Sequence, residues 1–344
     1  MIYFIWQFVW GLLYKAKIDK KFSCFFLFFF LWAIMSFRSI DLGINDTKEI
    51  YLPAFNICQQ YSLAQVLSDN LFINEPLMTC YTWILSQCFQ SFQLYISLSC
   101  LITLFSFYYF IKNNSTPFLG VLIFFSTMYF YESFLIKQML ALSFILFSYK
   151  FLIKRSFVKF FLLVLIAGLF HKSAYFVLLL YFLSFVKLSN PIVLFTSIVF
   201  LFVICFKDQL LYILSLLPYF NFSVLIRDGV YSSTGDINFS HFLYFFIFIF
   251  CYFRLKNRDV YNSYLWAIFV GFLLNLLSVV VVEFYRFSLY FLCVSCVLIP
   301  LSLSTLAVKL NKFVSLLFIV FFVLYSYKTA LNCNCLFYSS FFDD

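Results

Sequence analysis

The sequence predicts an all-α integral membrane protein that crosses the bilayer many times. Hydrophobic residues make up 65% of the 344 residues. Charged residues make up only 11%, where soluble domains carry about 25%. The mean hydropathy is +1.01. A soluble domain could not bury this much apolar surface, so much of it must face lipid.

Apolar stretches along the chain predict about twelve transmembrane helices, with a count between about 10 and 13. Several stretches are shorter than the approximately 20 residues that a straight span requires. The predicted spans are residues 2–14, 22–37, 92–111, 118–134, 137–153, 157–170, 173–187, 191–206, 241–254, 262–280, 286–305 and 313–328.

The distribution of charge predicts the orientation of these spans. The first connection, KAKIDKK, carries four Lys, and short cytoplasmic connections are rich in Lys and Arg. Alternation from there assigns fifteen of the 23 Lys and Arg, and two of the 14 acids, to the inner face. The outer face keeps the other eight bases and twelve acids, and both termini. The net charge of +9 is therefore explained by membrane topology and does not indicate nucleic acid.

The chain is predicted to form a single transmembrane domain over residues 1–344, with two long outer loops. These loops cover approximately residues 38–91 and 207–240. Within the first loop, residues 77–90 are too short and too polar for a span, so we expect an interfacial or re-entrant segment there.

Ionisable residues gather at the predicted outer ends of the spans. Such residues cost about 2.5–3.5 kcal/mol at the centre of a membrane helix, so their presence near the bilayer suggests a site. The candidates are Arg38, Asp41, Asp46, Glu75, Glu132, Lys137, His171, Lys172, Arg227, Asp228, Glu283 and Arg286.

Each candidate also has a structural explanation. Glu132 and Lys137 could be exposed charges in a loop, and Asp46 could be a residue that forms a turn. Arg286 could extend its side chain to the lipid headgroups, with Glu283 as its ion-pair partner. His171 fits an ordinary turn. CxxC at Cys293 and Cys296 has no second pair, so a metal site there is not expected.

The combination of candidates favours a site for a lipid-linked diphosphate. Arg binds phosphate through two parallel hydrogen bonds, and Lys supplies a point charge. A neutral histidine or a carboxylate can accept a proton from an attacking hydroxyl. No glycine-rich phosphate loop, HExxH or GxSxG motif is present in the sequence.

Several short motifs occur in a fixed order along the chain. An outer segment with Arg38, Gly43, Asp46 and Tyr51 comes first, followed by Glu75–Pro76. Lys137 then opens KQMLAL, His171 lies in FHKSAY, and Arg286 opens RFSLYF. This order resembles the EpsG family of membrane polysaccharide polymerases, which is grouped with the Wzy O-antigen polymerases. Two details depart from the family pattern: Lys137 replaces the usual Arg, and Gly43 and Asp46 are separated by two residues instead of one.

The resemblance implies a GT-C-like helical bundle with an outer-face cavity and a glycosyltransferase activity. Such an enzyme joins oligosaccharide repeat units carried on undecaprenyl diphosphate, at the outer side of the bacterial inner membrane. It implies no metal, nucleotide sugar or other cofactor, and no nucleic acid. The lipid bilayer, a chain-length regulator and a flippase are the other expected partners.

The resemblance also assigns roles to the candidates. Arg286, Arg38 and Lys137 are expected to bind the leaving diphosphate. His171, Asp46 or Glu283 is expected to orient or deprotonate the acceptor hydroxyl, and Glu75, Glu132 and Arg227 are further site candidates. Three alternatives stay open: a flippase for the same lipid-linked unit, an O-antigen ligase, and a membrane scaffold subunit without activity.

Overall fold

The structure is a computed structural model, and it describes residues 2–16, 19–42, 46–113, 116–206, 209, 237–279, 284–336 and 338–340. Helices dominate this part of the chain, and its isolated β-bridge pairs Arg38 with Ser340. The chain divides into two compact units, Met1–Leu178 with Ser295–Asp344, and Leu179–Val294. The single domain predicted over residues 1–344 stays a prediction.

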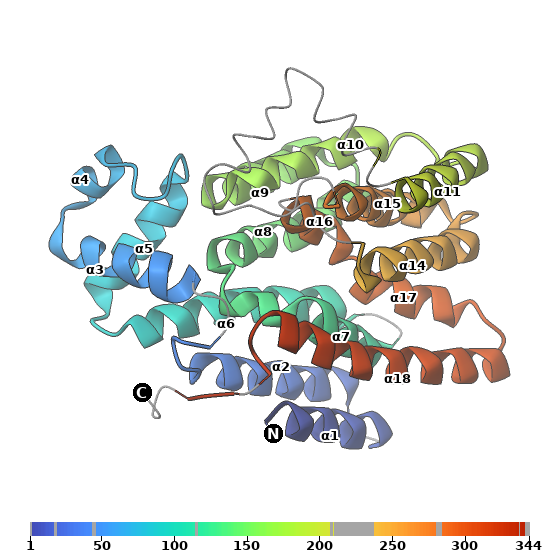
Figure 1. Cartoon of the computed structure of the whole chain (residues 1–344), viewed down its shortest axis with the longest axis horizontal. Helices are drawn as coiled ribbons and strands as arrows, with labels where there is room; N and C mark the ends of the chain where they lie inside the picture. The colour runs from blue at the N-terminus through green and yellow to red at the C-terminus, as the bar shows by residue number, and fades with distance from the viewer. Residues whose placement is uncertain are drawn as a thin grey trace. The chain divides into compact units, whose positions relative to one another are not determined.

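The first unit contains most of the helices (Figure 1). They are α1 (Ile2–Lys15), α2 (Lys20–Ser36), η1 (Thr47–Tyr51), α3 (Leu52–Gln60), α4 (Leu63–Ser68), α5 (Pro76–Cys88), α6 (Phe92–Ile111), α7 (Pro117–Thr127), η2 (Tyr129–Ser133), α8 (Ile136–Ile153), α9 (Phe157–Phe170), η3 (Lys172–Leu178), α17 (Ser295–Ser304) and α18 (Val308–Asn332).

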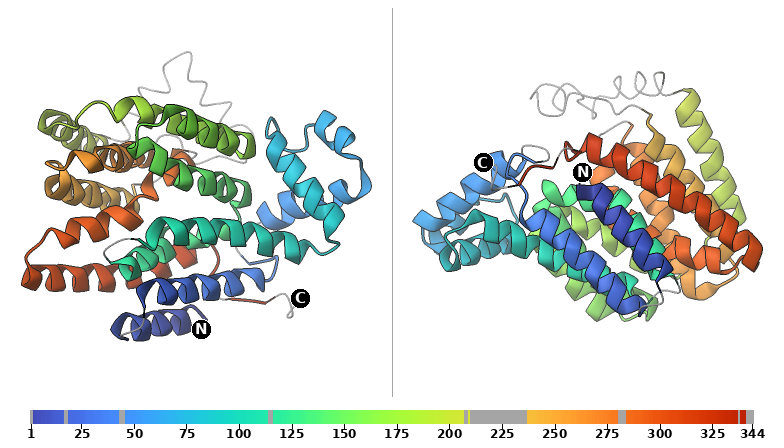
Figure 2. Two further views of the ribbon diagram at one scale, coloured as in Figure 1. Left: turned by 180° about the vertical axis from the view of Figure 1, so that it is seen from behind. Right: turned by 90° about the horizontal axis from the view of Figure 1, so that it is seen from below.

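Helix α6 runs between α2 and α8, and α8 packs in turn on α9 (Figures 1 and 2). Small polar residues line the α6–α8 interface, where Ser143 Oγ donates to Thr103 Oγ1 over 3.5 Å. Such residues allow close helix approach and cross-helix hydrogen bonds in membranes. The short helices α3, α4 and α5 gather at the end of α6 that begins at Phe92.

Helices α7 and α18 have opposite surroundings. Every residue of α7 is buried, as expected for a helix that is apolar on all sides, and α2, α17 and α18 pack around it. Pro117 in its first turn suits a helix start. In α18, only 6% of the most apolar window is buried, although that window has a mean hydropathy of 1.9. A long apolar helix of which protein buries so little fits contact with lipid.

The second unit contains α10 (Leu179–Leu183), α11 (Asn190–Cys205), α14 (Phe239–Leu255), η4 (Asp259–Tyr261), α15 (Asn262–Leu277) and α16 (Phe284–Leu292). Helix α15 is its centre, since it packs against α10, α14 and α16. Rings of α11, α14 and α15 meet at Phe200, Phe245 and Phe272. Trp266 Nε1 donates to Val186 O over 2.6 Å and ties α15 to the connection after α10.

The prediction of an all-α polytopic membrane protein is confirmed. By length and apolarity, four described helices could each cross a membrane, or up to five if α16 and α17 form one broken span. The four are Phe92–Ile111, Ile136–Ile153, Asp259–Leu277 and Val308–Asn332. Each of the twelve predicted spans overlaps a described helix. The GT-C-like cavity stays a prediction, and most of the predicted loop 207–240 lies outside the described residues.

Candidate functional site

Glu75 is the centre of a polar cluster in the first unit. It directly precedes α5, whose first helical residue is Pro76. Asn70 and Asn74 adopt positive φ angles of 53° and 59° in the turn before it, which asparagine tolerates well. Asn74 N–H donates to Asn70 Oδ1 over 2.8 Å, and Glu75 N–H donates to Phe72 O over 2.8 Å. This turn delivers Glu75 to the interior, where its side chain is 1% exposed.

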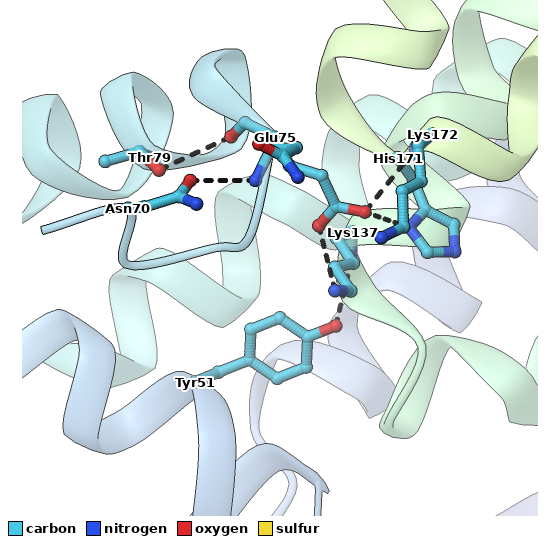
Figure 3. A network of polar contacts seen from close by, with 8 residues as sticks. Tyr51, Asn70, Glu75, Thr79, Lys137, His171 and Lys172 are labelled. Atoms are coloured by element: carbon cyan, nitrogen blue, oxygen red, sulfur yellow. Dashed lines mark hydrogen bonds and ion pairs between the residues drawn. The ribbon is translucent and has the colours of Figure 1, made fainter. Parts of the chain in front are cut away.

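The carboxylate of Glu75 receives donors from two other segments of the chain (Figure 3). Lys137 Nζ lies 2.8 Å from Oε2, and His171 Nδ1 lies 2.5 Å from Oε1. Lys172 N–H also points at Oε1, at 3.4 Å. A residue before a helix often caps that helix with its own side chain, but the Glu75 carboxylate makes no such bond. Its two oxygens contact Lys137 and His171 instead.

Lys137 is placed by the start of α8. The first N–H groups of a helix have no partner within the helix, and the N–H of Lys137 donates to Tyr51 Oη over 3.2 Å. Tyr51 ends η1 and is buried, so this bond connects the first outer segment to α8. The Lys137 side chain is 29% exposed, and its ammonium also lies 5.9 Å from the centroid of the Phe72 ring.

His171 is placed by the end of α9. It follows the last helical residue with an extended backbone, at φ −154° and ψ 113°, and its N–H still donates to Ala167 O over 2.9 Å. Phe170 packs against Tyr81 of α5 with ring centroids 6.0 Å apart, so the two helices that carry Glu75 and His171 are held together. The His171 side chain is 16% exposed.

The charges of this cluster keep Glu75 ionised. Burial by itself raises the pKa of this carboxyl, but the hydrogen bonds from His171 and Lys137 and the nearby Lys137 ammonium are among the causes that lower the pKa below its ordinary value. Lys172 contributes its backbone N–H to the cluster, and the residue is exposed. The site thus offers an ionised carboxylate, the Lys137 ammonium and an imidazole. Within the described part of the chain, no group of three or more His, Cys, Asp and Glu could hold a metal ion.

Arg38 lies in the same unit but is fully buried. Its Nη1 donates to Ser39 O and Leu42 O, both at 3.2 Å. Its Nη2 donates to Thr47 Oγ1 at 3.3 Å and to Ser133 O at 2.8 Å. The guanidinium therefore ties the end of α2 to η1 and η2, and these donors face protein oxygens in this structure.

The structure brings only some of the predicted candidates together. Glu75, Lys137 and His171 meet directly, and Arg38 reaches η2, where Glu132 is fully buried within electrostatic range of Arg38. Asp46 is half-buried before η1 and makes no capping bond to it.

The remaining candidates belong to the second unit or lie outside the described residues. Arg286 lies in the first turn of the second unit's helix α16 and is half-buried. Arg227 and Glu283 lie outside the described residues. Their predicted roles, and that of Asp46, stay predictions.

The sequence did not predict that Glu75 would be the hub of the site. In the sequence, Glu75 is only one of the further site candidates. The two asparagines before it signal a turn, but 62 and 96 positions separate Glu75 from Lys137 and His171. Lys172 was a candidate as well, yet its backbone contact to Glu75 depends on the local fold.

Comparison with known proteins agrees with the resemblance noted in the sequence. The family model described as EpsG family matches residues 21–341, which is nearly the whole chain and includes every candidate residue. Neither the curated proteins nor the solved structures contain a match to the chain.

Proposed function

The chain belongs to the EpsG family, and from this premise we propose that it polymerises oligosaccharide repeat units carried on undecaprenyl diphosphate. Family membership makes it a polysaccharide polymerase-type membrane protein. The finer proposal is an O-antigen or capsule polymerase at the outer face of a bacterial inner membrane, with both termini outside. A flippase that supplies the lipid-linked units and a chain-length regulator are its proposed protein partners.

One observation carries the proposal. The Lys137 ammonium, the His171 ring and the Lys172 backbone N–H all contact the buried carboxylate of Glu75. A structural turn would need no such arrangement. An imidazole beside cations suits a transfer in which a hydroxyl loses a proton while a diphosphate leaves.

The proposed reaction forms one bond and breaks one bond. A sugar hydroxyl of the acceptor unit attacks the anomeric carbon that joins the growing glycan to its lipid diphosphate. The bond between that carbon and the diphosphate oxygen breaks, and undecaprenyl diphosphate leaves with the bonding electron pair. The hydroxyl proton passes to His171, with Asp46 or Glu283 as the alternative acceptors. No metal or nucleotide sugar takes part in this scheme.

The cations in this scheme stabilise the negative charge that grows on the leaving diphosphate. Lys137 shares the Glu75 carboxylate with the imidazole, and Lys172 follows His171 in the chain, whereas Arg286 is proposed as a phosphate ligand on the basis of its motif. Arg38 stays a proposed ligand too, although the donors described above would have to leave their protein oxygens to contact a phosphate.

The substitution His171→Gln tests the function. Gln can hydrogen-bond but cannot exchange a proton at neutral pH, and loss of general acid–base catalysis costs roughly 100- to 10,000-fold in rate. We expect cells with this variant to accumulate single repeat units on lipid carrier or core, at a normal membrane level of the protein. Gel analysis of the glycan reads the chain length.

The matched control is His241→Gln, because His241 is the second of the two histidines. His241 occupies the third position of α14 in a capping box, a position where Gln serves equally well. We expect normal polymer from this variant.

Other outcomes for His171→Gln identify the rival functions. Loss of all surface units would indicate a flippase, and full-length polymer retained on the lipid carrier would indicate a ligase. Normal polymer would leave His171 as a structural residue.

A further inference from the structure

The two ring nitrogens of His171 have different surroundings. Nδ1 faces Glu75 Oε1 at 2.5 Å. For Nε2, the described residues provide no hydrogen-bond partner, and the side chain keeps 16% of its surface exposed. One nitrogen is thus fixed from within the protein, and the other is left for a molecule from outside.

The protonation of Glu75 decides which nitrogen carries the hydrogen. An ionised carboxylate can only accept hydrogen bonds, so the ring nitrogen that faces it must be the donor. A neutral imidazole with hydrogen on Nδ1 has its lone pair on Nε2. Lys137 Nζ, 2.8 Å from Oε2, already places one positive charge beside this carboxylate.

We propose that Glu75 is a positioning residue that holds His171 in the Nδ1–H tautomer and so presents the Nε2 lone pair to the acceptor hydroxyl. The inference rests on the proposed function for the identity of that hydroxyl. The tautomer itself is a property of the protein alone, and it can be measured without substrate.

Lys137 contributes to this arrangement by engaging the second carboxylate oxygen. Both oxygens of Glu75 must accept, Oε2 from Lys137 and Oε1 from His171. A glutamine at position 75 has only one acceptor oxygen. Because the ammonium of Lys137 has no acceptor lone pair, the amide oxygen would turn to Lys137 and the amide NH₂ to His171 Nδ1. The ring would then have to carry its hydrogen on Nε2, so Nε2 would have no lone pair with which to accept a proton.

Nitrogen NMR of histidine tests the tautomer directly. The chain has only two histidines, so the His241→Gln protein, purified without a histidine tag, has His171 as its single histidine. With ¹⁵N-labelled histidine, protonated and unprotonated ring nitrogens resonate far apart, and coupling to the ring hydrogens distinguishes Nδ1 from Nε2. We expect Nδ1 protonated and Nε2 unprotonated at neutral pH. A ring with hydrogen on Nε2, or on both nitrogens, would overturn the proposal.

The substitution Glu75→Gln in the same background tests the cause. We expect the ring hydrogen to move to Nε2, and polymerisation to fall by roughly 100- to 10,000-fold, as when a catalytic histidine is held in the wrong tautomer. An unchanged tautomer would show that Glu75 does not set it. The control is Glu49→Gln, since Glu49 is an exposed acid of η1 in the same outer segment, and we expect wild-type spectra and polymer from it.

The two proposals fail in distinguishable ways. If the tautomer is as expected but His171→Gln makes normal polymer, the proposed role of His171 is wrong and the Glu75 geometry stands. If His171→Gln stops polymerisation but the tautomer is independent of Glu75, the function stands and the positioning role fails. Because the first NMR measurement needs no change at Glu75, a poorly folded Glu75 variant cannot hide the answer.

Discussion

At the scale of single residues, the kind of cation at each position has consequences. Lys137 meets one carboxylate oxygen through a single ammonium, which a point charge does well. Arg38 uses the fork of its guanidinium to hold four protein oxygens. Arg286, in the first turn of α16, is a further cation for which the sequence motif predicts phosphate contact.

Arg286→Lys separates phosphate binding from membrane anchoring. Lysine keeps the charge but loses the planar fork that binds two phosphate oxygens at once. If Arg286 binds the diphosphate, we expect severe loss of polymer at a normal protein level, read from glycan gels and immunoblots of the same membranes. The control is Arg258→Lys, at an exposed position of the connection before η4, and we expect it to be neutral. Full-length polymer from Arg286→Lys would reduce Arg286 to an anchor.

At the scale of elements, close helix packing depends on individual glycines. A Cβ on Gly120 of α7 would lie 2.6 Å from the backbone oxygen of Cys296 in α17. A backbone oxygen cannot move aside as a flexible side chain can, so the two helices would have to separate. Gly11 of α1 offers the opposite case, because its Cβ would meet nothing within 4 Å.

We therefore expect Gly120→Ala to destabilise the protein and Gly11→Ala to leave it unchanged or more stable. Overpacking costs typically about 1–3 kcal/mol. Alanine in place of a helical glycine whose Cβ would meet no neighbour gains up to about 1 kcal/mol. Thermal unfolding of both variants in detergent measures the difference. Equal stability of the two would show that α7 and α17 do not pack this closely.

The elements also show how far the sequence could predict the fold. Residues 92–111 were predicted as a span and form α6 over the same residues, because length, apolarity and flanking polar residues agree there. Residues 173–187 were predicted as one span, yet they hold all but the first residue of η3 and the short α10. Residues 118–134 likewise include most of α7 and all of η2. Hydropathy records how apolar a stretch is, and it does not detect where hydrogen bonding changes within it.

The candidate site was predictable in composition but not in its contacts. His171 and Lys137 follow from ionisable residues at the ends of apolar stretches, which the sequence displays directly. The role of Glu75 depends on a turn at Asn70 and Asn74 and on the packing of α5 against α9. The two asparagines signal the turn, but the packing of α5 against α9 is a tertiary contact for which a single sequence contains no signal.

At the scale of the whole molecule, the contacts of the first unit agree with the predicted alternation of spans. Arg38 follows α2, Glu75 precedes α5, Ser133 precedes α8 and His171 follows α9. Hydrogen bonds join Arg38 to Ser133 and Glu75 to Lys137 and His171. Connections that were assigned to one face on charge alone therefore contact one another. The side of the membrane on which these connections lie stays a prediction, which an experiment can test.

Cysteine labelling at Ser68 and Asn113 decides the orientation. Both positions are exposed, and α6, with its 20 residues, lies between them in the chain, enough to cross a hydrocarbon core of about 30 Å. In a background depleted of the eleven native cysteines, we expect a membrane-impermeant maleimide to label Ser68→Cys in intact spheroplasts. Asn113→Cys should react only after permeabilisation, which also serves as the control for reactivity. Labelling of Asn113→Cys alone from outside would place the Glu75 cluster on the cytoplasmic side, where a polymerase that acts on outward-facing lipid-linked units could not use it.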